Sequence, residues 1–547
     1  MLERSRAPRR SLAAGVLAAA GVLFTTVGPA QAADFPAKDS RYHSYSEMVT
    51  EIKAVAAAHP SIVSVFSIGK SYQGRDLWAA KISDHVATDE DEPEILFDAL
   101  HHAREHMTVE QALYLYHQLV DRYGSDSQIT NLVDTREIFI IFAVNPDGFV
   151  YDLTCGGSHA PYCAWRKNRQ PNAGSSAIGT DLNRNYAYRF GCCGGSSSNP
   201  ANIEYRGAAA WSTPETRAVR DFVLSRIVGG IQQIKAHITF HTNGKLILWP
   251  YGYTTKNVPV DMTALDQKTF VAMGKAMAAR NGYTPQQSSD LYVTDGDQID
   301  WLYGTQRIFS FTWELYPPET ATVWGDHYPP DETIASATAN NRSALLWFLG
   351  IAGCPYGAIS QATEWCGPLF DDFEINRGWE VNPYGTDTAS TGAFQRGDPS
   401  PTSAGGLAMQ ADLTTSGRGG LFTGLAAGAS ANANDLDGWS TIRSRAIAIP
   451  HDGRSRLLAF RVWWAHGISS KYDSLKVYLE DANGTRTLAW AVSGTSTPRA
   501  GAWRDVRVPL PDVATPTARI VVIATDGGPD STVEAGIDDL RITAPVS

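Results

Sequence analysis

Residues 100–106 contain several side chains of the types that bind metal ions. His102 and Glu105 stand in an H-x-x-E spacing, which can direct an imidazole and a carboxylate at one cation. A closed structural zinc site has four protein ligands, whereas a catalytic zinc site has three and leaves one position for water. A third ligand further along the chain would therefore complete a catalytic site.

His241 is the strongest candidate for the third ligand. It follows the apolar residues 238–240, which predict a strand, and would lie at the carboxyl edge of a sheet, where α/β folds place their sites. His237 lies on the same face of that strand and is the alternative ligand. His101 and His106 flank the first pair and are expected to be neighbours of the site.

The pattern from residue 34 to about 354 alternates between strand-like and helix-like runs. β-Branched and aromatic residues predict strands at 62–68, 77–82, 95–100, 138–144, 238–241, 246–249 and 308–314. Apolar periodicity and end signals predict helices at 46–58, from 214 onward and at 261–279, with a further helix-like run from 107. This order predicts a mixed α/β sheet with helices on both faces.

Beyond residue 366 the sequence pattern is typical of an all-β domain. Leu475, Val477 and Leu479 alternate with polar residues, and Asn483-Gly484 then offers a hairpin turn. Several further short strand-like runs follow, and together they predict a β-sandwich. Two domains are also what a chain of 547 residues leads one to expect.

The amino terminus has the features of a secretory signal peptide. Four arginines between positions 4 and 10 precede the apolar residues 12–24, and Ala30-Gln31-Ala32 then supplies a small-residue cleavage site. A membrane anchor is the alternative, but the apolar run is shorter than the roughly 20 residues that a span needs. The predicted divisions are a signal peptide at 1–32, a first domain at 33–355, a linker at 356–368 and a β-sandwich at 369–547.

Export also fits the cysteine count. Six cysteines in an oxidising compartment predict three disulfides. Cys155 with Cys163 and Cys354 with Cys366 are the expected local pairs. For the adjacent Cys192 and Cys193, a strained bridge, two free thiols and a different pairing all stay open. A net charge of −11 argues against nucleic acid and anionic membrane as partners, because both require a basic surface.

Several motifs in the first domain resemble those of zinc-dependent metallocarboxypeptidases of the carboxypeptidase A type, in particular the secreted bacterial carboxypeptidase T branch. The matching strings occur in the family's order, at residues 102–105, 165–169, 180–185, 241–242, 292–301 and 311–314. The resemblance implies that residues 33–355 form a catalytic domain with a mixed sheet of the eight-stranded type. It also implies an extracellular exopeptidase that acts on the C-termini of peptides or proteins.

The resemblance implies a role for each matching residue at the metal. His102, Glu105 and His241 would hold one Zn²⁺ ion, which lowers the pKa of a bound water toward about 7. Glu314 matches the family's general base, and its alternative is a carboxylate in a surface ion pair. Arg166 matches the residue that stabilises the oxyanion, a task suited to a fixed guanidinium in a dry site.

Other matching residues are implied to bind substrate. Asn183 and Arg184 resemble the clamp for the terminal carboxylate, which the planar fork of arginine can bind at two points. Tyr292 matches a tyrosine that closes over the end of the substrate. Arg104 matches a substrate-side arginine near the metal, and a simple ion pair is its alternative.

The pocket for the terminal side chain is expected to include Asp297 and Ile299. In the family an apolar residue at the position of Ile299 goes with apolar ends, and an acidic one goes with basic ends. With Asp297 close by, the sequence predicts a preference for apolar ends first and basic ends second. The alternative is that Asp297 caps a turn and does not contact substrate.

Calcium and carbohydrate are further expected partners. The acidic residues 89–94 offer clustered oxygen ligands for a structural Ca²⁺ ion, with a solvated loop as the alternative. Asp371, Asp372, Asp538 and Asp539 would share a second calcium ion if the two ends of the β-sandwich pair. Six tryptophans in this domain offer a surface for a polysaccharide or the cell wall, although most are expected in the core.

Two other functions fit parts of the sequence. A peptidase that trims peptidoglycan stem peptides would use the same metal and water, and would cut D-configured or γ-linked bonds. An inactive relative that only binds peptides or glycans is the other possibility, but the complete set His102, Glu105, His241 and Glu314 argues against it.

Overall fold

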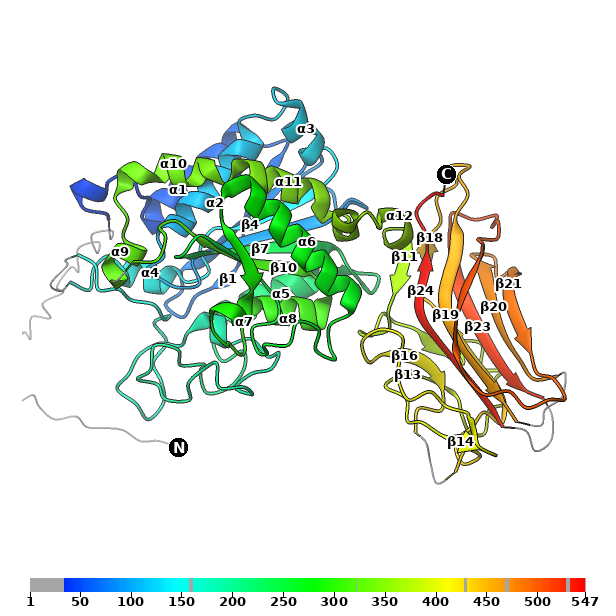
Figure 1. Ribbon diagram of the computed structural model, residues 1–547. Helices are drawn as coiled ribbons and strands as arrows, with labels where there is room; N and C mark the ends of the chain where they lie inside the picture. Colours follow the sequence, from blue (N-terminus) through cyan, green and yellow to red (C-terminus); the bar gives the residue numbers. More distant parts are fainter. Residues whose placement is uncertain are drawn as a thin grey trace, which may run out of the picture.

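The computed structural model describes residues 34–156, 161–320, 322–426, 430–467, 472–527 and 532–546. An α/β region comes first in the chain, and an all-β region follows it (Figure 1). The predicted signal peptide lies outside the described residues. Within the described ranges, the helices are all too short or too polar to cross a membrane.

A mixed sheet of eight strands forms the centre of the α/β region, in the order β1-β2-β4-β3-β7-β10-β8-β9. Strands β4, β3, β7 and β10 run parallel to one another, whereas β1, β2 and β8 introduce antiparallel pairs. The bounds are β1 (Val63–Lys70), β2 (Asp76–Ile82), β3 (Glu94–Ala99), β4 (Glu137–Ile141), β7 (Ile234–Thr242), β8 (Leu246–Trp249), β9 (Thr284–Gln287) and β10 (Phe309–Leu315).

The predicted strands of this sheet are confirmed, and only β9 was not predicted. Thr284–Gln287 contains Pro285 and two glutamines and shows no apolar alternation. Such a sequence is tolerated because β9 lies at the edge of the sheet, where proline does not interrupt a ladder on both sides. The short hairpin β5 (Ile227–Val228) and β6 (Ile231–Gln232) lies outside the main sheet.

The helices begin and end at the signals in the sequence. Thr213 caps α5 by accepting a hydrogen bond from the amide of Thr216, and Pro214 occupies the first turn. Gly282, with φ of 73°, ends α6 in the left-handed conformation that glycine adopts without strain. The longer helices are α1 (Tyr45–Ala58), α2 (Met107–Val120), α5 (Pro214–Ser225), α6 (Ala264–Asn281), α8 (Gln298–Gln306) and α11 (Arg342–Ala352).

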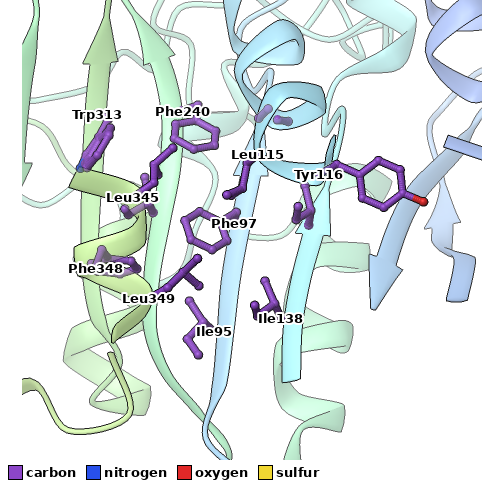
Figure 2. Close-up of a cluster of buried hydrophobic side chains, with 14 of the residues drawn as sticks. Ile95, Phe97, Leu115, Tyr116, Ile138, Phe240, Trp313, Leu345, Phe348 and Leu349 are labelled. Carbon is purple, nitrogen blue, oxygen red and sulfur yellow. The ribbon is translucent and has the colours of Figure 1, made fainter. Parts of the chain in front are cut away.

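Strand alternation divides the apolar side chains between two cores. Along β4, Ile138 and Ile140 join the larger core, whereas Phe139 and Ile141 join the smaller one. The larger core packs against α2 and α11, and it contains Phe97, Phe240 and Phe348 side by side (Figure 2). The sheet is thus buried on both faces, as its continuous apolar strands predict.

Three parallel strands bring their carboxyl ends to one edge of the sheet. There β3 leads into residues 100–106, β7 ends at Thr242 and β10 ends at Leu315. A long segment between α4 (Pro146–Asp152) and α5 contains little regular structure apart from the short helix η2 (Leu182–Arg184). Loops of this length in a compact domain are usually functional.

The all-β region consists mainly of two antiparallel sheets that share one core, as expected for a β-sandwich. One sheet has the order β13-β16-β24-β19-β22, with β11 on β24, and the other has the order β12-β17-β23-β20-β21, with β18 on β23. Their longest strands are β19 (Leu457–His466), β20 (Ser474–Asp481), β21 (Arg486–Ser493), β23 (Thr517–Asp526) and β24 (Val533–Ile542). Phe460 and Trp464 of one sheet and Val477 and Leu479 of the other lie in the same cluster.

Most tryptophans of the β-sandwich belong to its interior. Trp463 and Trp464 are buried, and Trp379 and Trp490 pack against the core. Trp439 is the exception, at 39% exposed. The described residues therefore do not form an aromatic platform for sugars from this set.

The segment between the two regions is folded. It contains η4 (Pro355–Ile359) and α12 (Ala362–Trp365), and Phe370 packs its ring against those of Tyr356 and Trp365. The buried Arg307 of the α/β region lies 3.7 Å from Asp372 and 3.3 Å from Glu374. The three disulfides join Cys155 to Cys163, Cys192 to Cys193 and Cys354 to Cys366, which confirms both local pairs and resolves the third.

Replacing Phe348 by alanine tests the larger core. Because this side chain is fully buried between α11 and the sheet, its loss is expected to destabilise the α/β region by about 3–5 kcal/mol. Leu224→Ala, at an exposed position of α5, is the matched control, and its free energy of unfolding is expected to change by no more than about 0.5 kcal/mol. Denaturant unfolding followed by tryptophan fluorescence measures both, and equal midpoints for the two variants would contradict the assignment.

Candidate metal and substrate site

His102, Glu105 and His241 come together as one buried cluster at the carboxyl edge of the sheet. Their ligand atoms all lie within 4.8 Å of one another. The two oxygens of Glu105 lie 2.7 Å from His102 Nδ1 and 3.0 Å from His241 Nδ1, and the two Nδ1 atoms are 3.1 Å apart. Two imidazoles and one carboxylate therefore face a common point.

Two adjacent parallel strands position this cluster. At the end of β3, Leu100 adopts a left-handed conformation with φ of 60°, which turns the chain before His102. The turn ends where α2 begins at Met107, so Glu105 is held between a strand and a helix. Strand β7 pairs with β3 and supplies His241, while the amide of Thr242 donates to Glu105 Oε2 at 3.2 Å.

The other histidines near the cluster have different partners. His237 Nε2 lies 2.9 Å from Asp98 and its Nδ1 lies 2.6 Å from Ser310 Oγ, deep in the protein. His101 Nε2 lies 2.8 Å from the hydroxyl of Tyr186. His106 is 3.0 Å from Asp152 and is surrounded by aromatic rings. The geometry therefore favours His241 over its alternative on the same strand.

Asp181 supports the cluster, and the sequence analysis did not give it a role. Its two oxygens lie 3.1 Å from His102 Nε2 and 2.9 Å from Arg166 Nε. Burial works against the charged carboxylate, but Arg166 and His102 more than offset it and hold the pKa of Asp181 well below its usual range. Asp181 therefore orients both the imidazole and the guanidinium.

Glu314 lies beside the cluster on the neighbouring strand. In the parallel pair β7 and β10 it is the register partner of His241, so both side chains emerge at the same level. Burial and repulsion from the Glu105 carboxylate raise the pKa of Glu314 well above its usual range, against the pull of Arg166 and Arg184. The opposite holds for Glu105, whose pKa is lowered because His102 and His241 outweigh its burial.

The arginines predicted to bind substrate surround the same edge. Arg184 is almost fully buried, donates to the carbonyl oxygens of Gly195 and Asn183, and has its Nη2 atom 3.5 Å from Glu204. Among the described residues that Nη2 atom has no hydrogen-bond acceptor. Arg104 is also largely enclosed, and its Nη1 atom makes one long bond of 3.5 Å to the carbonyl of Ala164.

The remaining predicted substrate residues lie close to Arg184. Asn183 Oδ1 accepts a hydrogen bond from the amide of Gln298, which ties it to the start of α8. The ring of Tyr292 is 46% exposed, with its centroid 5.9 Å from the guanidinium carbon of Arg184. Tyr292 is thus partly exposed beside a buried arginine, and its closing over substrate stays a prediction.

Asp297 and Ile299 occupy the first turn of α8. Asp297 is the N-cap residue, since one oxygen accepts from the amide of Asp300 at 2.9 Å and the other from the hydroxyl of Thr294. Its geometry therefore matches the alternative in which it caps a turn. Ile299 is 2% exposed in this structure. A direct contact of either residue with substrate stays a prediction.

A second residue without a predicted role, Asp295, organises the loop next to Arg184. This buried carboxylate accepts hydrogen bonds from the amides of Gly191, Cys193 and Gly195 and from the hydroxyl of Ser196. It thereby fixes the carbonyl of Gly195 to which Arg184 donates. The only signal for it in the sequence was its place in the acidic string that follows Tyr292.

Several members of the acidic run at residues 89–94 are paired with basic groups. Asp89 and Glu94 both form ion pairs with Arg226, and the amide of Glu90 donates to Glu137. Glu90 also lies near Asp84 and His85 in an exposed group. A calcium ion at this run stays a prediction. The second calcium site, predicted in the β-sandwich, also stays a prediction. There β11 pairs with β24, which brings Asp371 opposite Leu540 and so beside Asp539.

Comparison with known proteins identifies the family. The family model described as zinc carboxypeptidase matches residues 48–344, which is more than half of the chain. The chain belongs to the zinc carboxypeptidase family. The match includes both metal-ligand strands and Glu314, so the site described above lies within the region shared with the family.

Relatives of the chain carry the same family name. A zinc carboxypeptidase of Saccharothrix mutabilis subsp. capreolus is 47% identical over 321 residues, which cover 59% of this chain and 72% of that protein. Human carboxypeptidase A1 is 35% identical over 277 residues, or 50% of this chain. The match spans 62% of the human protein, which is less than two thirds of its length.

A solved structure agrees with this zinc carboxypeptidase fold. The crystal structure of thrombin activatable fibrinolysis inhibitor superposes with a TM-score of 0.50 at 27% identity. The superposition covers 57% of this chain and 74% of that one. The comparison supports the mixed sheet with helices predicted from the sequence.

The residues present fit the zinc ion that the family implies. Two histidines and one carboxylate are the ligand set of several catalytic zinc sites, which keep a further position for water. The Nε2 atom of His241 is buried without a hydrogen-bond partner among the described residues, whereas the Nε2 atom of His102 is hydrogen-bonded to Asp181. The Nδ1 atoms of both histidines point at Glu105 and are the ligands that this geometry offers.

His241→Gln and His237→Gln distinguish the two histidines on β7. His241→Gln is expected to abolish stoichiometric zinc binding, because it removes one of three ligands. His237→Gln is expected to retain the zinc while losing about 1–3 kcal/mol of stability, since Asp98 and Ser310 lose a buried partner. Metal analysis of the dialysed proteins measures the difference, and zinc loss only in His237→Gln would reverse the assignment.

Proposed function

We propose that the protein is a secreted zinc-dependent exopeptidase that removes the C-terminal amino acid from peptides. The observation that carries this proposal is the placement of Glu314 directly beside His241 and near the buried Arg184, whose Nη2 atom has no hydrogen-bond acceptor among the described residues. A carboxylate beside the metal ligands suits hydrolysis, and a buried cation suits the free carboxylate of a chain end. Family membership supports the same chemistry.

We propose that His102, Glu105 and His241 hold the metal. A bound Zn²⁺ ion supplies Lewis-acid activation of a water molecule and of the scissile carbonyl. Glu314 accepts the proton of the attacking water and then donates it to the leaving amine.

Arg166 is the proposed partner of the oxyanion that forms during attack. Its side chain is 10% exposed and is fixed by two contacts of 2.9 Å to Asp181. A cation that is already held in place stabilises developing charge without reorganising. Arg104 adds positive charge on the same side of the site.

Arg184 and Asn183 are the proposed clamp for the terminal carboxylate. Buried charge-assisted hydrogen bonds of this kind are stronger than neutral ones, and an amidated end would leave the arginine without its acceptor. Tyr292 is proposed to close over the bound end, since it is exposed here and near the guanidinium. The proposed preference is for apolar terminal side chains first, because Ile299 is apolar, and for basic ones second.

Localisation and domain division are also proposals. Three disulfides fit an oxidising compartment and so support export after removal of residues 1–32. We propose residues 33–355 as the catalytic domain, 356–368 as the connection and 369–547 as an accessory β-sandwich. Binding of a polysaccharide or the cell wall by this sandwich stays a prediction.

Peptide hydrolysis monitored by mass spectrometry tests the proposal. Matched peptides ending in Phe, Arg or Glu, each also prepared as the amide, are incubated with the purified protein with and without a zinc chelator. Stepwise loss from the free-carboxylate peptides only, fastest for Phe, then Arg, and abolished by the chelator, is the expected result. A zinc-loaded protein that releases nothing would contradict the proposal and favour peptidoglycan stem peptides as the substrate to try next.

Glu314→Gln tests the proton-transfer step separately. The amide cannot accept the proton of water, so kcat is expected to fall by about 10²–10⁴-fold. Zinc content should be unchanged, because Glu314 is not among the proposed ligands. Glu319→Gln, an exposed carboxylate a few residues later, is the matched control and should leave kcat unchanged. Equal activity of both variants would remove Glu314 from the mechanism.

A further inference from the structure

A cavity of about 760 Å³ lies between the α/β region and the β-sandwich. Lys235 at the start of β7, the turn between β5 and β6, and Arg377 and Arg445 of the β-sandwich all line it. Its volume falls in the range of pockets that bind small molecules. Trp365 and Phe370 give the cavity an apolar side.

This cavity is distinct from the proposed catalytic site. Lys235 and His241 lie near opposite ends of strand β7, about 20 Å apart along the strand. The catalytic site uses the carboxyl edge of the sheet, and the cavity lies at the opposite edge. Residues of the cavity therefore have no contact with the metal cluster.

The basic residues of the cavity have too few acidic partners. Of five that line it, Arg307 lies near Asp372 and Glu374, and Arg456 binds Asp452. The other three are Lys235, Arg377 and Arg445. Among the described residues, Lys235 Nζ has a single hydrogen bond, of 2.6 Å, to the carbonyl of Gln232.

The charges of the two arginines from the β-sandwich are also only weakly neutralised by acidic partners. Arg377 has one ion pair, with 3.5 Å between its Nε and Asp371, and that Nε has no hydrogen-bond partner within the described ranges. Arg445 makes one long bond, of 3.4 Å, to the carbonyl of Ala446. The carboxylate of Asp371 is shared with the indole of Trp379.

The acidic residues that line the cavity do not neutralise these three cations. Asp266 is held by the hydroxyls of Tyr303 and Tyr356, and Asp372 pairs with Arg307. Asp91 is exposed to solvent. Glu92 lies near other acidic groups and near Arg136, and burial together with repulsion from the acidic groups raises its pKa.

Mutual repulsion between the cations lowers the pKa values of two of them. Burial, followed by repulsion from Arg377, lowers the pKa of Lys235 to about 8. The same two causes lower the pKa of Arg445 to about 10. Three like charges are thus held together, partly out of water, and among the described residues Asp371 is the only carboxylate that forms an ion pair with any of them. This arrangement is costly unless a counter-ion is bound.

We propose that this cavity binds a multivalent oxyanion, a sulfate or phosphate group, between Lys235, Arg377 and Arg445. Arginine presents a planar fork to such groups and lysine a point charge, and both are found in proteins that bind phosphate. The apolar side of the cavity suits an oxyanion carried on an organic body. Because the cations come from both regions of the chain, the bound anion would hold the β-sandwich against the catalytic region.

Isothermal titration of the full-length protein with sodium sulfate, against sodium chloride at equal ionic strength, tests the proposal. Saturable binding of sulfate is expected, and a sulfated disaccharide as a second ligand distinguishes a free ion from a group on a larger molecule. Arg445→Gln and Lys235→Met are each expected to weaken sulfate binding about tenfold or more. Arg418→Gln, an exposed arginine paired with Asp398 elsewhere on the β-sandwich, is the matched control.

The melting temperature of the Arg445→Gln variant without sulfate shows whether Arg445 binds the anion or only stabilises the fold. Arg445→Gln removes repulsion, so the ligand-free variant is expected to melt no lower than the parent protein while losing its stabilisation by sulfate. A variant that is already destabilised without sulfate, and that keeps the parent's affinity, would overturn the proposal. So would identical effects of sulfate and chloride on the parent protein.

The pH dependence gives an independent readout. Sulfate does not titrate between pH 7 and 9, whereas Lys235, which faces Arg377, Arg445, Glu94 and Asp91, loses its proton in that range. Sulfate affinity is therefore expected to fall as pH rises through about 8, and Lys235→Met should bind weakly with little pH dependence. An affinity that stays constant from pH 7 to 9 in the parent protein would exclude Lys235 from the site.

Discussion

The proposed metal site depends on one buried carboxylate placed between two imidazoles. His102 Nδ1 and His241 Nδ1 lie within 3.0 Å of the oxygens of Glu105, and they hold the pKa of this buried carboxyl well below its usual range. The arrangement requires β3 and β7 to be adjacent and parallel, since each supplies part of it. A shift of β7 by one residue would turn His241 to the other face of the sheet, so strand register and metal chemistry are fixed together.

Buried carboxylates also organise the irregular segments around this centre. Asp181 connects the loop that contains Arg166 to the metal-binding turn. Asp295 gathers the backbone amides of the loop that supports Arg184. Each carboxylate satisfies several donors at once, which lets a long segment with little helix or strand hold charged side chains in fixed places.

Much of the α/β region could be predicted from local patterns. Runs of β-branched and aromatic residues located its strands, because both faces of the sheet pack against helices. Spacing and strand ends pointed to His102, Glu105 and His241 as candidate metal ligands, which the structure brings together. Strand β9 was not predictable, since its sequence is tolerated only by its edge position. The cap formed by Asp297 and the roles of Asp181 and Asp295 depend on partners far away in the chain, and spacing alone does not reveal these.

The disulfide between Cys354 and Cys366 closes a ring around the joint of the two regions. Both η4 and α12 lie inside this ring of the chain. A single cut by another protease within residues 355–365 would therefore leave the two halves covalently linked. The joint would survive such nicking, and separation of the halves would also require reduction of the bridge.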